Sequence, residues 1–405
     1  MLAIAAAILA GVVALPGCDR SDRSVDMQYL RALPYAGGVP VDHDLPVGVI
    51  RHDVGRTCPG YNLYTLFALG RADLIDAAGN IVLTWSEPGT TWMHAELLPR
   101  GDLLVVGAGA AVVTADGRDS HLDDATRFVA RYDLHGALLW KRPHPGHHDL
   151  DITPTGQLLL LGQRYCRIPA IARDLPVKDD LLMLLDPGDG RVVATRSVME
   201  AIGNRDAAFP LYRGGQAVAG ERRFVDLLHG NSVQWMPWPE LVGTHPLYGT
   251  DNVLVCFRHQ NRVAMFDWRR QEVVWSWGRN RLSGPHDAQV LADGDILVFD
   301  NGLGQRRSRL VEVDPRSERI VWQYEADPPE SFYTVSKGSV QRLPNGNTLA
   351  AESDRGRAFE ITPDGEIVWE FVCPYRTPQG LRAAIGKIRR YPEAFVAEIL
   401  AQPEP

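Results

Sequence analysis

The stretches DAQVLADGDILVFD, residues 287–300, and RLVEVDPRSERIVW, residues 309–322, decide the fold of this chain. Each consists of an apolar segment, a turn of polar residues and a second apolar segment. The glycine in the first turn, Gly294, supplies the positive φ that a tight hairpin needs. Each stretch therefore predicts a β-hairpin, and the two together predict one antiparallel sheet of four strands.

The same two hairpins recur along the chain. Copies of the first cover residues 95–107, 149–162 and 339–352. Copies of the second, four of which end in tryptophan, cover residues 128–140, 181–194, 224–235, 262–275 and 358–369. The ends of successive repeats lie about 40 to 55 residues apart, which is the usual size of a β-propeller blade.

We therefore expect an all-β fold, a β-propeller of six four-stranded blades over residues 60–375, with seven blades as the alternative. Full units are expected to start near residues 94, 148, 207, 245, 286 and 338. A half-unit at 63–85 either closes the ring or lies outside it. The repeat stops after Trp369, and the polar and apolar pattern of residues 378–401 predicts helix, so 376–405 is expected to be a helical tail.

Length and composition agree with a repeat protein. A chain of 405 residues is long for one ordinary core, but repeats that pack on their neighbours form one domain at this length. The net charge of −8 argues against a nucleic-acid partner, which needs a basic face. No strand alternates with a long helical segment, which disfavours a parallel α/β fold.

The N-terminus has the pattern of an export signal. Residues 1–17 are small and apolar, and the stretch Leu15-Pro16-Gly17-Cys18 resembles a bacterial lipoprotein cleavage box. We expect residues 1–17 to be a signal peptide, Cys18 to be the lipidated N-terminus, and residues 18–59 to be a tether. Asp19 resembles a signal for retention at the inner membrane. The expected location is the bacterial cell envelope, facing the periplasm or the exterior.

Four further cysteines, Cys58, Cys166, Cys256 and Cys373, follow at wide spacing. An exported compartment permits disulfides, and four cysteines allow three pairings, which remain open. No pair is spaced as in a structural zinc site.

Several histidines occupy the same place in different repeats, just before the first strand of a unit: His94, His147, His148, His245 and His286. Such positions lie around the mouth of the central channel of a propeller, so we expect these imidazoles to face one cavity. Arg258 and Asn301 follow strands and are expected to point the same way. The following histidines are expected at the surface or in loops: His43, His52, His121, His135, His144 and His229.

A cluster of histidine and arginine without a carboxylate cage favours an anionic substrate. Arginine offers a planar charged fork for a tetrahedral oxyanion, and imidazole acts as nucleophile, base or acid near neutral pH. Three histidines at one rim could instead bind zinc.

At these residues the sequence resembles the bacterial arylsulfotransferase family of β-propellers. The resemblance covers most of residues 60–375 and is carried by GHHDLDITPTGQLLLL, VLVCFRHQNRVAMFDWRRQEVVWSWG, SGPHDAQVLADGDILVFDNG and GSVQRLPNGNTLAAESDRGRAFEITPDGEIVWEF.

The resemblance implies transfer of a sulfuryl group from an aryl sulfate ester to a phenolic acceptor, with no nucleotide sulfate donor, cofactor or metal. It implies that His286 attacks sulfur and carries the sulfo group, and that Arg258 holds the sulfate oxygens. His245 and one of the pair His147 and His148 would stabilise the sulfuryl group and help protonate the leaving phenolate; our expected catalytic residue of that pair is His148. We expect His147, Asn301 and His94 to bind substrate.

Two other functions remain open at this point. The chain could be a non-catalytic exported propeller that binds a ligand or forms a scaffold, or a metal-dependent hydrolase. Convergence of His148, His245, Arg258 and His286 on one cavity would favour catalysis. Hydrogen bonds of each histidine within its own blade would favour the scaffold.

Overall fold

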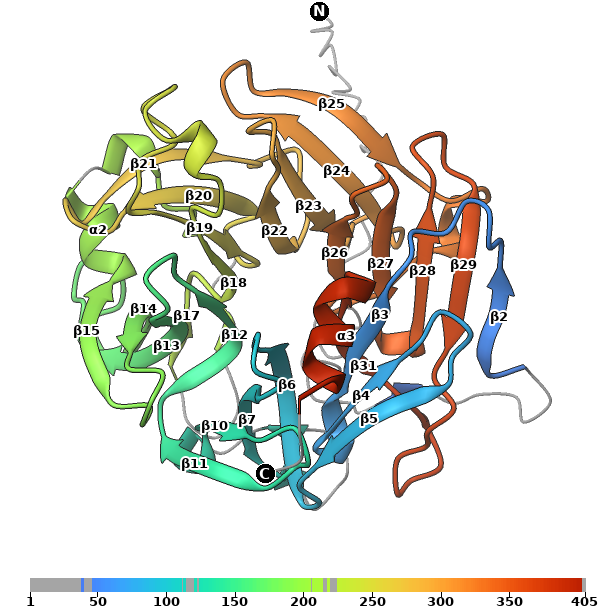
Figure 1. Cartoon of the computed structure of the whole chain (residues 1–405). Helices are drawn as coiled ribbons and strands as arrows, with labels where there is room; N and C mark the ends of the chain where they lie inside the picture. The colour runs from blue at the N-terminus through green and yellow to red at the C-terminus, as the bar shows by residue number, and fades with distance from the viewer. Residues whose placement is uncertain are drawn as a thin grey trace, which may run out of the picture.

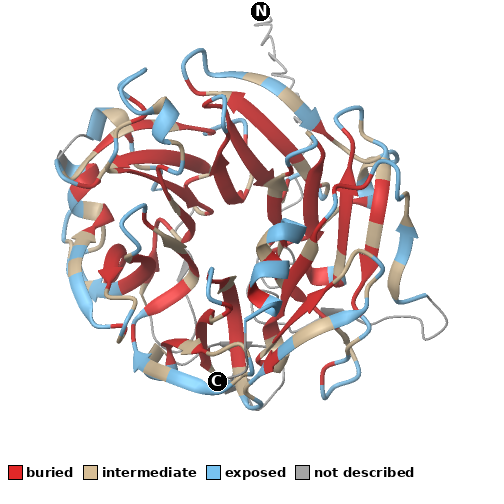
Figure 2. Ribbon diagram, viewed as in Figure 1, coloured by how far each residue is buried: buried red, intermediate tan, exposed pale blue. Residues whose placement is uncertain are grey.

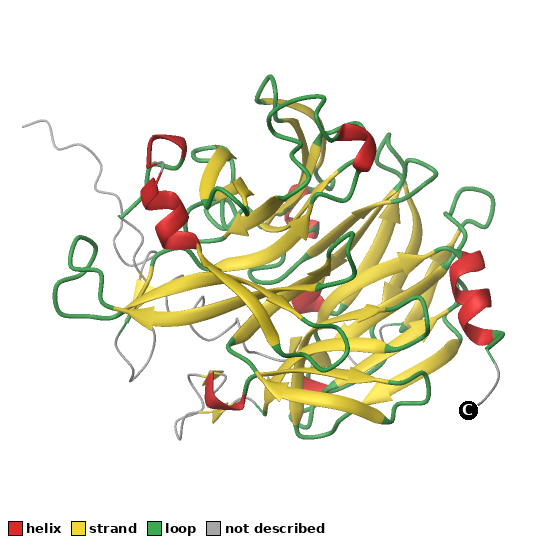
Figure 3. Cartoon of the chain, turned by 60° about the vertical axis from the view of Figure 1, so that its left-hand side comes forward, coloured by secondary structure: helices red, strands yellow, loops and turns green. Residues whose placement is uncertain are grey.

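The chain forms a ring of six blades around a central channel, as a computed structural model of the protein shows (Figure 1). The structure describes residues 38–39, 46–110, 112–113, 120–121, 124–204, 206–213, 217–218 and 224–402. The predicted signal peptide, Cys18 and most of the predicted tether lie outside these residues. Figure 3 shows that strands and loops dominate the fold, with only short helices. No helix among the described residues is long and apolar enough to span a bilayer.

Each blade is an antiparallel sheet, named here from its inner to its outer strand. Blade 1 consists of β31 (Ile385–Tyr391), β3 (Tyr61–Leu66), β4 (Arg71–Ile75) and β5 (Ile81–Ser86). Blade 2 consists of β6 (Thr90–Leu97), β7 (Leu103–Gly109), β10 (Phe128–Tyr132) and β11 (Leu138–Pro143). Blade 3 consists of β12 (Gly146–Ile152), β13 (Leu158–Cys166), β14 (Val177–Leu185) and β15 (Val192–Ser197).

The other three blades follow in chain order. Blade 4 consists of β18 (Gly230–Trp235), β19 (Asn252–Phe257), β20 (Arg262–Asp267) and β21 (Glu272–Trp277). Blade 5 consists of β22 (His286–Val290), β23 (Ile296–Asp300), β24 (Arg309–Asp314) and β25 (Arg319–Tyr324). Blade 6 consists of β26 (Ser339–Arg342), β27 (Thr348–Glu352), β28 (Arg357–Ile361) and β29 (Ile367–Val372), with β2 (Gly48–His52) added outside.

A few short elements complete the described chain. The remaining strands are β1 (Gly38–Val39), β8 (Val112–Val113), β9 (Ser120–His121), β16 (Ala217–Val218), β17 (Val225–Asp226) and β30 (Arg382–Ala383). The helices are α2 (Val198–Asn204) and α3 (Glu393–Leu400). Single 3-10 turns are η2 (Phe67–Leu69), η3 (Asp124–Thr126), η4 (Asp206–Ala208), η5 (Pro239–Leu241), η6 (Pro329–Ser331) and η7 (Ser353–Arg355).

The C-terminal strand closes the ring, because β31 is the inner strand of the blade that begins with β3. The prediction of six blades is therefore confirmed, with the half-unit at 63–85 completed from the other end of the chain. The predicted helix over 378–401 is wrong for residues 385–391 and confirmed only as α3. The stretch IGKIRRY lacks strand-like alternation because its charged side chains are buried against acids: Lys387 against Asp149 and Asp287, and Arg390 against Glu360.

Two of the predicted unit starts, 207 and 245, are also wrong. A single blade covers this region, and its inner strand β18 lies within the stretch assigned to an outer hairpin at 224–235. Residues 198–204 form α2 and residues 206–208 form η4, and both pack against β21 of blade 4 rather than adding strands.

Hydrogen bonds between side chain and backbone join consecutive inner strands around the channel. Each of four side chains accepts the N–H of a residue in the next blade: Asp149 from Val233, Ser232 from Ala288, Asp287 from Val340, and Ser339 from Ile388. These bonds lie at 2.8 to 3.2 Å and satisfy backbone donors on the channel side of the inner strands, which are the edge strands of their sheets.

The tryptophans of the repeat join the outer part of each blade to the next blade in the ring. Each indole N–H donates to a carbonyl in the turn between the two outer strands of the next blade: Trp85 to Asp133, Trp140 to Pro187, Trp277 to Glu318, Trp322 to Pro363, and Trp369 to Ala77. Blade 3 has no such tryptophan; its Arg196 lies over the ring of Trp268 in blade 4 at 5.0 Å.

Apolar side chains fill the spaces between neighbouring blades. One hydrophobic cluster joins blades 1 and 2, another blades 2 and 3, a third blades 3, 4 and 5, and two more join blade 5 to blade 6 and blade 6 to blade 1. Figure 2 shows the resulting pattern, with buried inner and middle strands and exposed outer edges. The four described cysteines are free thiols, so none of the three disulfide pairings is present.

The closure of the ring by β31 predicts a strong effect of C-terminal truncation. A chain that ends at Ala384 loses the inner strand of blade 1 and the Lys387 bridges, and leaves β3 without its partner. We expect it to lose its cooperative thermal unfolding transition, measured by circular dichroism. A chain that ends at Gln402 is the control and should unfold like the full chain. An unchanged transition in the shorter chain would show that β31 is dispensable for closure.

Candidate active site

A cavity of about 50 Å³ lies where the inner strands begin, at one mouth of the channel. Residues from all six blades line it: Phe67, Met93, Arg127, His148, Asn231, His286, Asp287, Lys337, Gly338, Gly386 and Lys387. The predicted catalytic residues His148 and His286 therefore face the same cavity, from blades 3 and 5.

Irregular backbone directs these side chains toward the cavity. The pairing of the inner strand shifts register between Gly146 and Leu150, and again between His286 and Gln289. His148 and Asp287 have positive φ values of 62° and 44°, which cost energy for residues other than glycine. Bulges and left-handed residues of this kind concentrate at functional sites.

His286 is held in one tautomer by Asn301. The amide nitrogen of Asn301 donates to the carbonyls of Thr334 and Lys337, both at 2.9 Å, so its oxygen faces His286. That oxygen lies 2.7 Å from Nδ1 of His286, and the carbonyl of Gly284 lies 3.0 Å from the same nitrogen. Since both partners only accept, Nδ1 carries the proton and Nε2 keeps its lone pair.

Burial keeps His286 neutral. It lowers the pKa of His286 to about 3, with a smaller contribution from the nearby charge of Arg258, against the opposing hydrogen bond to Asn301. A neutral imidazole with a free Nε2 is the nucleophilic form. Asn301 is fully buried and does not line the cavity, so its predicted substrate contact is corrected to a contact with His286.

His147 and His148 form a second oriented pair. Nε2 of His147 lies 3.1 Å from the carbonyl of Gly162 and so donates to it, which leaves Nδ1 as an acceptor. Nδ1 of His148 lies 2.7 Å from that atom and donates to it, so Nε2 of His148 is unprotonated. Burial lowers the pKa of both imidazoles well below the usual value. His148 lines the cavity, whereas His147 lies behind it and is not in position for the predicted substrate contact.

His245 is not part of this site, which corrects the prediction. It is exposed, in the loop between β18 and β19. The ladder pairs Trp235 with Val253 at that end of the blade and Gly230 with Phe257 at the other end, where the cavity lies. His245 therefore lies at the opposite end of blade 4 from Arg258.

His229 lies where His245 was expected. It directly precedes β18, has a positive φ of 53°, and its ring lies 5.2 Å from that of His148 between centroids. The prediction placed it in a loop because the repeat was divided wrongly around it. The signal was present in VDLLHGNSV, where a histidine precedes an inner strand as in GPHDAQ.

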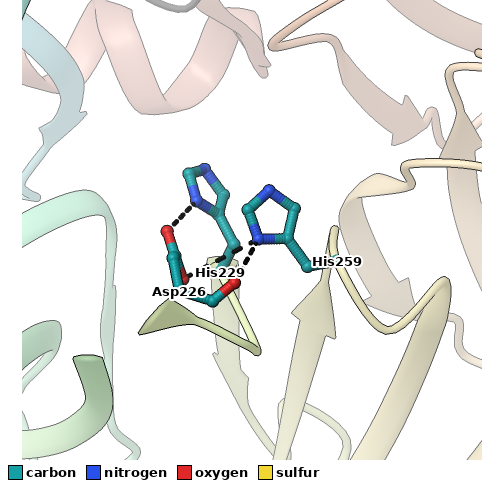
Figure 4. A group of neighbouring side chains, drawn as sticks. All are labelled: Asp226, His229 and His259. Atoms are coloured by element: carbon teal, nitrogen blue, oxygen red, sulfur yellow. Dashed lines mark hydrogen bonds and ion pairs between the residues drawn. The ribbon is translucent and has the colours of Figure 1, made fainter. Parts of the chain in front are cut away.

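A chain of contacts extends from His229 away from the channel (Figure 4). Nδ1 of His229 donates to Oδ2 of Asp226 at 2.6 Å, and Nδ1 of His259 donates to the backbone oxygen of Asp226 at 2.7 Å. Arg258 lies 3.2 Å from Nε2 of His259 and is buried beside the cavity without lining it.

His94 lies away from the cavity lining, which corrects its predicted role. It is fully buried, with Nδ1 3.5 Å from Asp149 and Nε2 3.5 Å from Glu96. Met93, the residue before His94, lines the cavity instead.

Among the described residues, no three histidines lie close enough together to bind one metal ion. Asp226, His229 and His259 do lie close enough together to be considered as metal ligands. Both Nδ1 atoms donate hydrogen bonds here, whereas a metal needs their lone pairs. Two positively charged side chains already lie beside this group: Lys178 at 3.4 Å from Asp226, and Arg258 next to His259. The group is better suited to hydrogen bonding than to metal binding.

Comparison with known families gives the family of this chain. A family model described as Arylsulfotransferase (ASST) matches residues 116–373, which is well over half of the chain. The chain belongs to the arylsulfotransferase family. Membership implies a transferase that acts on aryl substrates, and the resemblance stated from the sequence is confirmed at that level. No curated protein gives a significant match.

Of three solved structures, the first resembles this arylsulfotransferase-family chain in fold alone, and the other two are more distant, with TM-scores below 0.5. A protein of unknown function from Bacteroides caccae is 15% identical, with a TM-score of 0.53 over 82% of this chain and 98% of its own. A functionally unknown protein from Desulfotomaculum acetoxidans is 12% identical, with a TM-score of 0.44 over 82% and 100%. A virginiamycin B lyase from Staphylococcus aureus is 9% identical, with a TM-score of 0.43 over 81% and 89%.

The charge of the cavity suits the anionic esters expected of an arylsulfotransferase family member. Arg127, Lys337 and Lys387 contribute three cations to the lining, and Asp287 contributes one carboxylate. The two lining histidines are neutral because burial lowers their pKa values. Asp124, Asp354 and Asp149 pair with these cations from outside the lining, so the lining offers an anion charged N–H donors rather than an uncompensated positive charge.

Neutral buried histidines predict a loss of stability in mild acid. Below about pH 6.5 the unfolded chain binds a proton at His286 that the folded chain excludes until about pH 3, so the free energy of unfolding falls as pH falls through this window. Between pH 7.5 and 5.0 we expect His286→Asn to lose about 2 kcal/mol less than the wild type, measured by urea denaturation. His135→Asn, which removes an exposed imidazole, should follow the wild type. Parallel losses in all three proteins would contradict the prediction.

Proposed function

We propose that this protein transfers a sulfuryl group from an aryl sulfate ester to a phenol through a sulfohistidine at His286. The observation that supports it most is the hydrogen bond of Nδ1 to Asn301, which reserves Nε2 for attack on sulfur in a cavity lined by three cations. The proposal needs no nucleotide donor and no metal.

The reaction has two half-reactions. In the first, the Nε2 lone pair of His286 forms an N–S bond while the bond from sulfur to the aryl oxygen breaks, and the aryl oxygen leaves with the electron pair as phenolate, which takes up a proton. In the second, the oxygen of the acceptor phenol loses its proton as it attacks the same sulfur, the N–S bond breaks, and the electron pair returns to Nε2. Dividing one transfer into two steps gives ping-pong kinetics.

The cations around the cavity suit the charge on the sulfuryl oxygens, which changes during transfer. Arg127 and Lys387 are held by carboxylates, Asp124 at 2.8 Å and Asp149 at 2.9 Å, so their heads are fixed before substrate binds. Fixed charges need no reorganisation during the reaction, and such preorganisation is a large part of catalysis. The charge of Arg258 acts on His286, but Arg258 lies beside the cavity, so its predicted contact with the sulfate oxygens stays a prediction.

The N-terminal sequence adds a proposal on location. Export and lipidation at Cys18 would place the propeller in the cell envelope, where aryl sulfates can reach it without crossing the inner membrane. Labelling with a radioactive fatty acid, lost in Cys18→Ala, tests this.

The primary test is release of 4-nitrophenol from 4-nitrophenyl sulfate with phenol as acceptor. We expect His286→Asn to lower the rate at least about 10³-fold, because the nucleophile is gone. His245→Asn should retain wild-type activity, since His245 is exposed at the far end of blade 4. With donor alone, mass spectrometry should find one SO₃ group on the His286 peptide.

Three results would contradict this proposal. Wild-type activity in His286→Asn would contradict a sulfohistidine at this residue. Loss of activity in His245→Asn would contradict the position of His245 away from the site. Absence of transfer by folded wild-type protein, over a panel of aryl sulfates and phenols, would favour the non-catalytic binding propeller.

A further inference from the structure

Two imidazoles, of His148 and His286, line the cavity, and that of His229 lies next to them, in ring contact with His148. Each of the three has a different partner at Nδ1. Nδ1 of His286 faces the amide oxygen of Asn301, and Nδ1 of His148 faces the imidazole of His147. Nδ1 of His229 faces the carboxylate of Asp226 at 2.6 Å, the shortest of the three contacts. Figure 4 shows that the second ring nitrogen of His229 points away from this carboxylate.

The partner determines what an imidazole can do. An amide or a neutral imidazole accepts the Nδ1 proton but carries no charge, so it gives little support to an imidazolium ion. A carboxylate holds the ring in one tautomer and also stabilises the imidazolium that forms when Nε2 takes up a proton. Of the three, only His229 has this partner.

Several fixed contacts hold Asp226 in its place. It lies on β17, which pairs in parallel with β14 so that Asp226 is opposite Lys178. Nζ of Lys178 lies 3.4 Å from Oδ2, and the backbone oxygen of Asp226 accepts from His259. Asp226 is therefore carried by the sheet of blade 3, whereas His229 begins blade 4.

Charges on every side of the pair bear on its protonation. Lys178, His229 and His259 keep the pKa of Asp226 well below its usual range, although burial opposes them, so the carboxylate is ionised. Burial lowers the pKa of His229, and Asp226 raises it; His259 and Lys178 add to the lowering. In the empty protein His229 is neutral, and an anionic aryl sulfate would shift this balance toward the imidazolium ion.

We propose that Asp226 is a positioning residue that makes His229 the proton carrier between the two phenols; this rests on the proposed function. As the acceptor oxygen attacks the sulfur on His286, its proton passes to Nε2 of His229. The imidazolium, paired with Asp226, then gives that proton to the aryl oxygen of the next donor as the S–O bond breaks. Each cycle consumes and returns one proton, and solvent supplies the first.

The dependence on the leaving group tests this assignment. In ping-pong kinetics, kcat/KM for the donor reports the first half-reaction alone. 4-Nitrophenolate leaves without a proton, whereas the more basic phenolate from phenyl sulfate needs one. In Asp226→Asn we expect kcat/KM to fall less than about tenfold for 4-nitrophenyl sulfate and at least about 100-fold for phenyl sulfate.

Matched variants separate positioning from simple damage to the fold. In a His229→Gln background, Asp226→Asn should not further increase the dependence of kcat/KM on the leaving group, because the two residues act as one unit. Asp73→Asn removes a buried carboxylate of blade 1 that bonds Tyr64 and Arg71, and should leave the dependence unchanged. Asp226→Glu keeps the charge and should recover at least about tenfold of the activity on phenyl sulfate relative to Asp226→Asn.

The outcomes distinguish this inference from the proposed function. Equal losses in Asp226→Asn for both esters would overturn the positioning role while sulfuryl transfer stands. If Asp226→Asn does not fold, Asp226→Glu decides in its place: a wild-type leaving-group dependence supports the role, and equal losses for both esters overturn it. Absence of transfer by the wild-type protein would overturn the proposed function and this inference with it.

Discussion

The structure depends most on a lysine that lies across the channel. Lys387, from the last strand, lies 2.9 Å from Asp149 of blade 3 and 2.8 Å from Asp287 of blade 5. Both carboxylates also accept a backbone N–H from the following blade, through Val233 and Val340. One buried cation thus ties the closing strand to two other blades and forms part of the cavity floor. Removal of one partner of such a network leaves an uncompensated charge, which costs several kcal/mol.

The same construction positions the chemistry. Asp287 follows His286 directly, in a left-handed conformation that the Lys387 and Val340 contacts stabilise. The bulge that this conformation produces turns the His286 side chain toward the cavity. The same contacts therefore close the ring and orient the candidate nucleophile. Hydrogen bonds and ion pairs that hold the blades together also compensate the strain at the bulge.

The site combines neutral imidazoles with cations that are already paired. Burial lowers the pKa values of His148 and His286, so neither competes as a positive charge with Lys387 or Arg127. Each imidazole takes its tautomer from a partner in its own blade or in the adjacent sheet. Hydrogen bonds within a blade, which the sequence alone would assign to a scaffold, here orient side chains toward the common cavity.

The sequence by itself determined the repeat, the all-β class, the family, and the place of His286 and of the His147 and His148 pair at one mouth of the channel. Its count of six blades was right, although it divided blade 4 into two units and left open whether the half-unit at 63–85 closes the ring. These follow from local patterns: alternation, turn glycines, and a histidine at a constant distance before a strand. The tertiary structure decided what depends on distant partners. Residues 385–391 form a strand because Lys387 and Arg390 meet buried acids from other blades. Only the assembled ring shows that His229 rather than His245 lies next to His148 at the cavity end of blade 4, and that Asn301 contacts His286. No local pattern encodes such contacts, because their partners lie tens to hundreds of residues away.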